Sequence, residues 1–402
     1  MTNLSQGWEW KSLYEILSND KYSIKRGPFG SALKKSFFVE NGVRVFEQYN
    51  AINNDPHWKR YFISYDKFKE LETFKAIEGD LLISCSGTLG KIVELPENTE
   101  IGIINQALLK IRLDNKKILN SYFIYYFNSP TMQGKILEST LGSAIKNIAS
   151  VKILKQIEIP IPPLKEQERI VGILDESFAN IDENIKILEQ DLLNLDELMQ
   201  GALQKAFNPL KDEAKENYKL PRDWEWKSLE SICKSISAGG DKPKNYTEKK
   251  SIDNQIPIYA NGINNNGLIG YTDKAVITKP SLTISARGTI GFVCIRKEPY
   301  YPIVRLICTI PNEKILYLEY LYFCLNFFIA KSDGSSIPQL TIPKFKVLQI
   351  PLPPLKEQKQ IASHLDELSL NIKNLKQNYQ TQIKDLQELK QSLLDKAFKG
   401  EL

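Results

Sequence analysis

The sequence predicts a mixed α/β (α+β) protein in which two globular domains are joined by two long antiparallel coiled-coil helices, with an internal pseudo-two-fold repeat. The first observation is a duplication, because the segment IPIPPLKEQERI at 159–170 returns as IPLPPLKEQKQI at 350–361. The second is that about forty residues of apolar heptad spacing follow each copy. A helix interior does not tolerate the Pro-Pro pair, so each copy marks a junction between a globular domain and a helix.

Length and composition favour a folded protein of two domains. The chain has 402 residues, of which 42% are hydrophobic, and this is enough to bury a sizeable core. It has no charged and then apolar leader and no apolar run of the length of a membrane span, so we expect a soluble, cytoplasmic protein. The five cysteines are scattered and include no C-x-x-C pair, so we expect free thiols and no metal site.

The positive charge is concentrated on the predicted globular domains. Residues 1–163 carry 21 basic and 17 acidic side chains, and residues 224–354 carry 16 and 10. The helical stretch 164–206 carries 4 basic and 10 acidic side chains and would repel a polyanion. This distribution favours nucleic acid at the globular domains, although it would also fit an ordinary solvated surface.

The repeat extends into the globular domains. LSQGWEWKSL at 4–13 matches LPRDWEWKSL at 220–229, and ISCSGTLG at 83–90 matches ISARGTIG at 284–291. The offset between the copies falls from 216 residues at the first match to 191 at the Pro-Pro junction, so the second copy is 25 residues shorter. The segments at the ends of the two copies match, whereas the sequence between them varies. This pattern is expected of one scaffold that carries two different specificities.

Short segments rich in Ile, Val, Tyr and Phe predict strands within each domain. The predicted strands are DLLISCS, GKIVEL and QALLKIRL in the first copy and SLTISAR, GFVCIR and VRLICTI in the second. A helix is predicted after each set, at 121–130 and 318–328.

The two long helices have apolar residues spaced alternately by three and four. In the first helix these positions are Val171, Leu174, Phe178, Ile181, Ile185, Leu188, Leu192, Leu195, Met199 and Ala202. In the second they are Ile361, Leu365, Leu368, Ile372, Leu375 and Tyr379, followed after an extra four-residue step, a stutter, by Ile383, Leu386 and Leu393. A helix with such a stripe must bury it, and the copy of the helix offers the only other stripe. Approximate two-fold symmetry requires the two helices to run antiparallel.

Taken together, the WEWKSL openings, the GPFGSALKKS loop at 27–36, the S-x-x-G-T-x-G turns, the PPLKEQ junctions and the KAF helix ends resemble the specificity subunit of a type I restriction-modification system. The resemblance covers essentially the whole chain. It implies target-recognition domains at 1–163 and 224–354, spacer helices at 164–207 and 355–402, and a linker at 208–223.

In that family each target-recognition domain reads one half of a split DNA sequence, and the helices dock methyltransferase subunits. The resemblance therefore implies double-stranded DNA, methyltransferase (modification) subunits, two of them, and restriction/translocase subunits as partners. It also implies no cofactor in this chain, with S-adenosylmethionine bound by the methyltransferase subunits. The half-sites should be unrelated, which makes the whole bipartite site asymmetric.

The sequence also predicts that the chain is not an enzyme. It has no Asn-Pro-Pro-aromatic methyltransferase motif, no G-x-G-x-x-G cofactor loop and no Walker loop, and NSPT at 128–131 lacks the second proline and the aromatic residue. We therefore expect no catalytic residue.

Candidate DNA-binding residues are polar or basic side chains on predicted loops, where Arg, Asn and Gln can read base edges and Lys, Ser and Thr can hold phosphates. In the first domain they are Lys25, Arg26, Ser31, Lys34, Lys35, Ser86, Thr88, Lys91, Lys146 and Asn147. In the second they are Lys242, Lys244, Asn245, Asn261, Asn264, Asn265, Arg287, Thr289, Ser335, Ser336 and Gln339. The alternative is that these are solvated turn residues.

Two other functions stay open at this point. One is the recognition subunit of a related restriction system in which methylation and cleavage share one polypeptide. The other is a coiled-coil scaffold whose globular ends bind proteins. Salt-dependent DNA binding would count against the scaffold.

Overall fold

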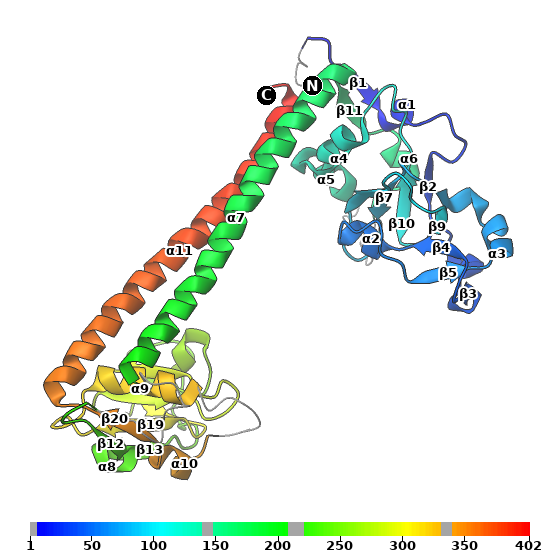
Figure 1. Cartoon of the computed structure of the whole chain (residues 1–402). Coiled ribbons are helices and arrows are strands. Elements are labelled where there is room, and N and C mark those ends of the chain that lie inside the picture. The colour runs from blue at the N-terminus through cyan, green and yellow to red at the C-terminus, as the bar shows by residue number, and fades with distance from the viewer. Residues whose placement is uncertain (1–5, 139–147, 208–220, 331–339) are drawn as a thin grey trace. The chain divides into compact units, whose positions relative to one another are not determined.

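The computed structural model describes residues 6–138, 148–207, 221–330 and 340–402, and these form two compact units (Figure 1). Unit 1 comprises Met1–Ile187 and Thr381–Leu402, and unit 2 comprises Leu188–Gln380. Each unit therefore contains one globular domain, part of its own long helix and part of the other long helix. No helix of the described residues is long and apolar enough to cross a membrane.

The described residues of unit 1 form three sheets and six short helices, besides their parts of the long helices. A two-stranded sheet pairs β1 (Glu9–Ser12) with β11 (Glu158–Ile161). A four-stranded sheet has the order β2 (Ile24–Arg26), β10 (Leu108–Ile111), β7 (Leu81–Ser84) and β8 (Ile92–Glu94). A five-stranded sheet has the order β3 (Phe38–Val39), β5 (Tyr61–Ile63), β4 (Val43–Phe46), β9 (Gly102–Ile104) and β6 (Lys75–Ala76). The helices are α1 (Leu13–Ile16), α2 (Gln48–Ile52), α3 (Tyr65–Glu70), α4 (Asn120–Asn128), α5 (Pro130–Glu138) and α6 (Val151–Leu154), and three 3-10 turns are η1 (Gly30–Ala32), η2 (Lys35–Phe37) and η3 (Glu72–Phe74).

Unit 2 repeats this plan with fewer elements. Its two-stranded sheet pairs β12 (Glu225–Ser228) with β20 (Gln349–Leu352), and its four-stranded sheet has the order β13 (Cys233–Ala238), β19 (Ile307–Pro311), β16 (Ser281–Ile284) and β17 (Val293–Arg296). Its third sheet has only three strands, β15 (Leu268–Thr272), β14 (Ile256–Tyr259) and β18 (Tyr301–Pro302). The helices are α8 (Leu229–Ile232), α9 (Leu318–Ala330) and α10 (Ile342–Lys346), with the 3-10 turn η5 (Asn264–Gly267). Part of the difference in length lies in this region, because the offset between matched segments falls from 213 at 42–46 to 201 at 83–90.

The six predicted strands are confirmed as β7, β8, β10, β16, β17 and β19. The predicted helix at 318–328 is confirmed as α9. The predicted single helix at 121–130 was wrong at its end, since α4 stops at Asn128 and α5 begins at Pro130. Extended backbone at Ser129 breaks the helix because the residue before a proline avoids the helical conformation.

The two most recognisable repeated segments pair with each other. In unit 1 the WEWKS strand β1 lies antiparallel to β11, with Glu9 opposite Ile161 and Lys11 opposite Ile159. In unit 2 β12 and β20 have the same register, with Glu225 opposite Leu352. The opening of each domain is thus closed by the junction that leads into its helix. Of the two tryptophans at this opening of unit 1, Trp8 is buried and Trp10 is 37% exposed.

Each PPLKEQ junction is closed by its glutamine. The buried Gln167 side chain accepts a hydrogen bond from Leu119 N at 2.8 Å and donates to the carbonyls of Lys117 and Pro162 at 3.0 and 2.9 Å. Gln358 makes the same three bonds in unit 2, to Tyr317 N and to the carbonyls of Ile315 and Pro353, each at 2.8 Å. An amide has both donors and acceptors, so a single side chain satisfies three backbone groups that are cut off from water.

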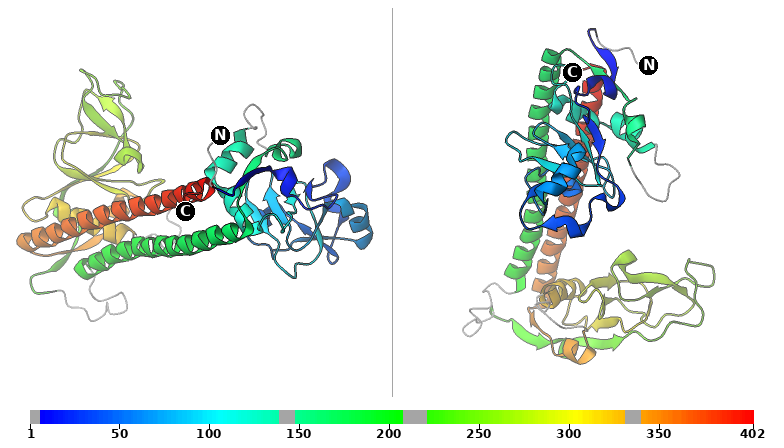
Figure 2. Two further views of the ribbon diagram at one scale, coloured as in Figure 1. Left: turned by 90° about the horizontal axis from the view of Figure 1, so that it is seen from above. Right: turned by 90° about the vertical axis from the view of Figure 1, so that its right-hand side faces the viewer.

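The long helices are α7 (Leu164–Phe207) and α11 (Leu355–Lys399), and they run antiparallel within each unit. In unit 1 the red end of α11 lies beside the first part of α7 (Figures 1 and 2). There Lys390 Nζ lies 2.5 Å from Asp182 Oδ1, and Arg169 donates to the carbonyl of Leu402. In unit 2 Lys376 pairs with Asp196. The predicted fold class, with antiparallel helices and an internal repeat, is confirmed.

The stutter in the second helix lies one step earlier than the sequence predicted. Leu375, which we assigned to the seam, is 40% exposed, while the neighbouring Lys376 is partly buried. With Lys376 and Lys390 at seam positions, the extra four-residue step lies between Ile372 and Lys376 and not between Tyr379 and Ile383. A lysine can cover the seam with its aliphatic stem while its ammonium reaches an acidic residue on α7.

The C-terminal end of each long helix packs into a globular core. The end of α11 packs into the core of unit 1, and the end of α7 packs into the core of unit 2. In unit 1 the core includes Leu394, Ala397 and Phe398 of α11. Phe398 lies edge-on to Tyr122 and Tyr126 of α4, with ring centroids 5.3 and 5.0 Å apart. In unit 2 the core includes Leu203 and Phe207 of α7, and Phe207 lies edge-on to Tyr320 at 5.5 Å. The repeated KAF ending is therefore a packing motif.

Candidate nucleic-acid interface

Four loops of unit 1 meet at one edge of its four-stranded sheet. Strands β2 and β7 both run antiparallel to β10, so the ends of β2 and β7 lie beside the start of β10. Strand β4 runs parallel to β9, and Asn105 N, just after β9, donates to the carbonyl of Phe46 at 2.9 Å. We call this group the loop edge of unit 1, and its segments are 26–30, 47–48, 85–91 and 105–107.

The same four loops meet in unit 2. Strands β13 and β16 run antiparallel to β19, and β14 runs parallel to β18. Ile303 N donates to the carbonyl of Tyr259 at 2.9 Å, which repeats the bond between Asn105 and Phe46. The loop edge of unit 2 has the segments 238–240, 260–262, 285–291 and 303–305.

A close backbone approach fixes the first loop of each edge. A side chain at Gly27 would bring its Cβ to 1.8 Å from the carbonyl oxygen of Asn105, and one at Gly239 would bring it to 2.6 Å from Ile303 N. Only glycine fits at such a contact. The first loop is therefore held against the turn that precedes β10 or β19.

An amide side chain in the second loop binds the S-x-x-G-T-x-G turn in both units. In unit 1 Ser86 Oγ donates to Gln48 Oε1 at 3.3 Å. In unit 2 Ala286 N donates to Asn261 Oδ1 at 2.8 Å, and Asn261 Nδ2 donates to the carbonyl of Val304 at 2.7 Å. Asn261 thus connects three of the four loops of its edge.

The loop edge of unit 1 brings together some of the predicted contact residues. Arg26 Nη2 lies 3.5 Å from the carbonyl of Cys85, next to Ser86, and Arg26 also lies over the ring of Phe29, which is 67% exposed. Thr88 and Lys91 are exposed on the turn. Ser31 follows the edge in η1 and is exposed.

Three predicted residues of unit 1 lie away from this edge. The ammonium of Lys25 lies over the rings of Tyr22 and Phe74, at 5.3 and 5.1 Å from their centroids. Lys34 and Lys35 are exposed beside Leu33, which packs in the small core under the five-stranded sheet.

In unit 2 the edge contains Asn261, the exposed Arg287 and Thr289, whose hydroxyl is buried in the turn. Asn264 and Asn265 follow in η5 and are exposed. The remaining predicted residues lie on the loop after Gly240, where Lys242 lies over the ring of Tyr246, Lys244 is exposed, and Asn245 Oδ1 accepts from Asn254.

Five predicted residues lie outside the described residues: Lys146, Asn147, Ser335, Ser336 and Gln339. Most of the predicted linker at 208–223 also lies outside them.

The prediction missed the turn immediately before β10 and β19. This turn places Gln106 on the loop edge of unit 1 and Val304 and Arg305 on that of unit 2, all three exposed. A signal was available, because the matched segments QALLKIRL and VRLICTI begin at these residues. The exposed aromatic Tyr49, stacked on Trp58 at 4.3 Å beside the second loop of unit 1, was missed as well.

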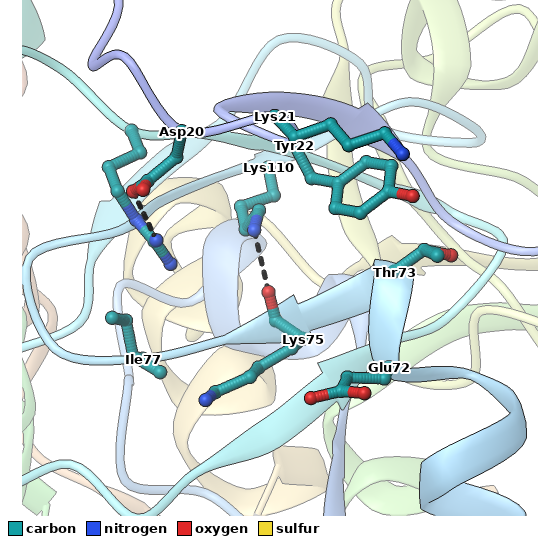
Figure 3. A pocket seen from close by; sticks show the side chains of 9 residues that line it. Asp20, Lys21, Tyr22, Glu72, Thr73, Lys75, Ile77 and Lys110 are labelled. Carbon is teal, nitrogen blue, oxygen red and sulfur yellow. Dashed lines mark hydrogen bonds and ion pairs between the residues drawn. The ribbon is translucent and has the colours of Figure 1, made fainter.

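In unit 1, the end of the four-stranded sheet opposite the loop edge carries a different group of charged side chains (Figure 3). A pocket of about 370 Å³ lies there, lined by Asp20, Lys21, Tyr22, Glu72, Thr73, Lys75, Ile77, Lys110 and Arg112. The buried Lys110 donates to the carbonyl of Lys75 at 2.6 Å, and Arg112 donates to Asp80 at 2.6 and 2.9 Å and to Asp20 at 2.7 Å.

These bonds explain the pKa shifts at this pocket. Burial lowers the pKa of Lys110, and the hydrogen bonds to Asp80 raise the pKa of Arg112. The hydrogen bond from Arg112 holds the pKa of Asp20 below its usual range. Because its charges are paired internally, we assign this cluster to stability and not to an anion site.

The cysteines are free thiols in the structure, and burial raises the pKa of Cys85 to about 12. Among the described residues, no group of three His, Cys, Asp or Glu side chains could hold a metal ion.

The fold and its two loop edges define a duplicated recognition protein, in which one scaffold presents two different sets of side chains. The family model described as "Type I restriction modification DNA specificity domain" matches residues 29–192 and 221–385, one match for each copy. The chain therefore belongs to the type I restriction-modification specificity subunits.

Curated relatives agree with this family. The chain is 33% identical over 268 residues to a putative type I specificity subunit, S.MpnORF507P of Mycoplasma pneumoniae, covering 65% of this chain and 67% of that protein. It is 24% identical over 355 residues to the EcoBI specificity subunit of Escherichia coli, covering 80% of this chain and 73% of the relative.

Solved structures share the fold. A chain from work on complex assembly and conformational transition of the type I R-M system has a TM-score of 0.80 at 20% identity, covering 100% of both chains. The HsdS subunit of Thermoanaerobacter tengcongensis has a TM-score of 0.66 at 20% identity, covering 100% of this chain and 98% of that chain.

Proposed function

We propose that this chain is the DNA-recognition subunit of a type I restriction-modification complex, in which each unit reads one half of a bipartite asymmetric site. The observation that carries the proposal is the pair of loop edges. The backbone hydrogen bonds that hold these loops correspond in the two units, whereas the side chains they present differ, with Gln48, Ser86 and Gln106 on one and Arg287 and Arg305 on the other.

These side chains suit base reading. Arginine can donate two hydrogen bonds to guanine. Asparagine or glutamine can donate one hydrogen bond to adenine and accept another from it. Because the two edges present different side chains, the half-sites are expected to be unrelated in sequence.

The chain has no catalytic role in this proposal. Methyl transfer would be performed by two methyltransferase (modification) subunits that bind S-adenosylmethionine, and cleavage by restriction/translocase subunits. The exposed apolar residues Ile187, Leu193 and Leu198 of α7 and Leu370 of α11 offer surface for docking such subunits. Family membership supports this assignment of partners.

Reconstitution tests the proposal. Methyltransferase subunits encoded beside this chain should methylate a defined bipartite site only when the chain is present, and the complex should bind that DNA with a steep dependence on salt. The isolated chain should neither methylate nor cleave DNA. Methylation by the isolated chain, or an assembled complex without salt-dependent DNA binding, would contradict the proposal, and the second result would favour the protein-binding scaffold.

A further inference from the structure

The turn before β19 is closed by the same backbone hydrogen bonds as the turn before β10. Leu306 N donates to the carbonyl of Ile303 at 3.1 Å, as Leu108 N does to that of Asn105 at 3.2 Å. Gly239 N donates to the carbonyl of Leu306 at 2.8 Å, as Gly27 N does to that of Leu108 at 2.9 Å. By this correspondence, Val304 and Arg305 of unit 2 take the places of Gln106 and Ala107 of unit 1.

The turn in unit 2 is held in an uncommon conformation. Val304 and Arg305 have φ of 54° and 58°, a region that β-branched residues rarely enter. Backbone hydrogen bonds from Val304 N to Gly240 and from Arg305 N to Gly239, each 2.9 Å, fix the two residues. The bond from Asn261 Nδ2 to the Val304 carbonyl fixes them from the other side. A surrounding structure that over-determines such a conformation is typical of functional positions.

This fixed turn presents its side chains outward. Val304 is 51% exposed and Arg305 is exposed. Among the described residues, the Arg305 guanidinium makes no hydrogen bond or ion pair, whereas the buried Arg296 of the same unit donates to Thr283 at 3.0 Å. The donors of Arg305 are thus available on a rigid support beside Arg287.

We propose that Arg305 is a specificity-determining residue of unit 2, which donates two hydrogen bonds to the N7 and O6 atoms of a guanine in the half-site read by that unit. This inference rests on the proposed function and names a residue for it. A guanidinium has the fork of donors that matches the guanine edge, and a backbone fixed at both neighbouring peptides limits the positions it can reach.

The equivalent turn of unit 1 provides the comparison. There Gln106 takes the place of Val304 and Ala107 that of Arg305, and neither residue has a positive φ, so this turn presents an exposed amide and no guanidinium. An amide matches adenine. Because the two corresponding turns present different hydrogen-bonding groups, we expect the two units to read different bases at this position.

The experiment uses the chain assembled with its methyltransferase subunits, in a host whose methylated motifs are read by whole-genome sequencing. Arg305→Ala should lose discrimination at one G·C position of one half-site, by about 5- to 150-fold against the other base pairs, while the other half-site and the spacing stay unchanged. Arg305→Lys keeps the charge but lacks the fork, so its affinity for the parent site should also fall, while its affinity for non-specific duplexes stays near that of the parent chain. The matched control is Lys314→Ala, an exposed cation beyond the other end of β19, which should leave the motif unchanged.

The alternative is that Arg305 contacts a phosphate. In that case Arg305→Ala would weaken binding equally for all duplexes and reduce the salt dependence, and Arg305→Lys would leave the motif intact. Either result would overturn the inference. If Arg305→Ala abolishes methylation in the host, binding of the purified complex to duplexes substituted at each position distinguishes the two cases. A parent complex that directs no methylated motif would instead overturn the proposed function itself.

Discussion

Phe398, near the end of the second long helix, lies edge-on to Tyr122 of the first globular domain, with ring centroids 5.3 Å apart. The phenol of Tyr122 in turn donates to the carbonyl of Pro160 at 2.8 Å, beside the Pro-Pro junction. The end of the chain is therefore part of the core of unit 1.

Truncating Phe398 should destabilise unit 1. Phe398→Ala removes a buried ring that packs on both Tyr122 and Tyr126, so the free energy of unfolding should fall by about 3 to 5 kcal/mol. Leu389→Ala, on the same helix at a residue 46% exposed, is the control and should change it by less than about 0.5 kcal/mol. Urea unfolding of the full chain measures both. Equal effects of the two substitutions would contradict the packing role of the KAF ending.

Gln167 at the first junction should contribute nearly as much as Phe398 to the free energy of unfolding. Gln167→Ala leaves the amide of Leu119 and the carbonyls of Lys117 and Pro162 without their partner, and each unsatisfied buried group costs about 1 to 3 kcal/mol. Glu168→Ala, at the exposed neighbouring position, should have little effect. Hydrogen exchange at Leu119 N is the specific measurement. Unchanged protection of that amide in Gln167→Ala would show that the bond does not stabilise the junction.

The seam of the second helix can be tested at two adjacent residues. Lys376→Asp places a like charge against Asp196 at a partly buried position, so it should weaken the packing of α11 on α7 in unit 2. Leu375→Asp should be tolerated because Leu375 is 40% exposed. Thermal unfolding compares the two variants. The opposite ranking would return the extra four-residue step to the place that the sequence predicted, after Tyr379.

The charge cluster at the pocket of unit 1 should be a source of stability. Asp80→Asn removes the buried partner of Arg112 and Lys110, and breaking a buried pair in this way costs about 3 to 5 kcal/mol. Asp20→Asn removes a partner that is 56% exposed and should cost about 0 to 1 kcal/mol.

The pH dependence has a defined sign. The pKa of Asp20 is lowered in the folded state, so its contribution is present above the ordinary value of 3.8 and is lost as the pH falls through the folded pKa. Asp20→Asn should therefore reduce the acid sensitivity of unfolding below about pH 4. Identical pH profiles for Asp20→Asn and the parent would contradict this assignment.

The repeat made much of the fold predictable from sequence. Duplicated segments located the junctions, and heptad spacing located both long helices. The seam at Lys376 was missed because a polar residue gives no apolar signal, although its stem can fill the same place. The role of Gln167 was missed since it depends on backbone groups 48 and 50 residues away.

The candidate interface was predictable in part. The glycine turns led to Arg26, Ser86, Asn261 and Arg287, which the structure places on the loop edges. Arg305 was missed because the segment that contains it predicts a strand, and only strand pairing shows that its first residues form a turn at the sheet edge.

The central claim is that each unit reads its own half of the DNA site. The most direct measurement is the methylated motif in a host whose chain has residues 14–158 exchanged for the same region of a relative with a different site. The account predicts that one half-site changes while the other half-site and the spacing between them stay as in the parent. Simultaneous change of both half-sites would contradict it.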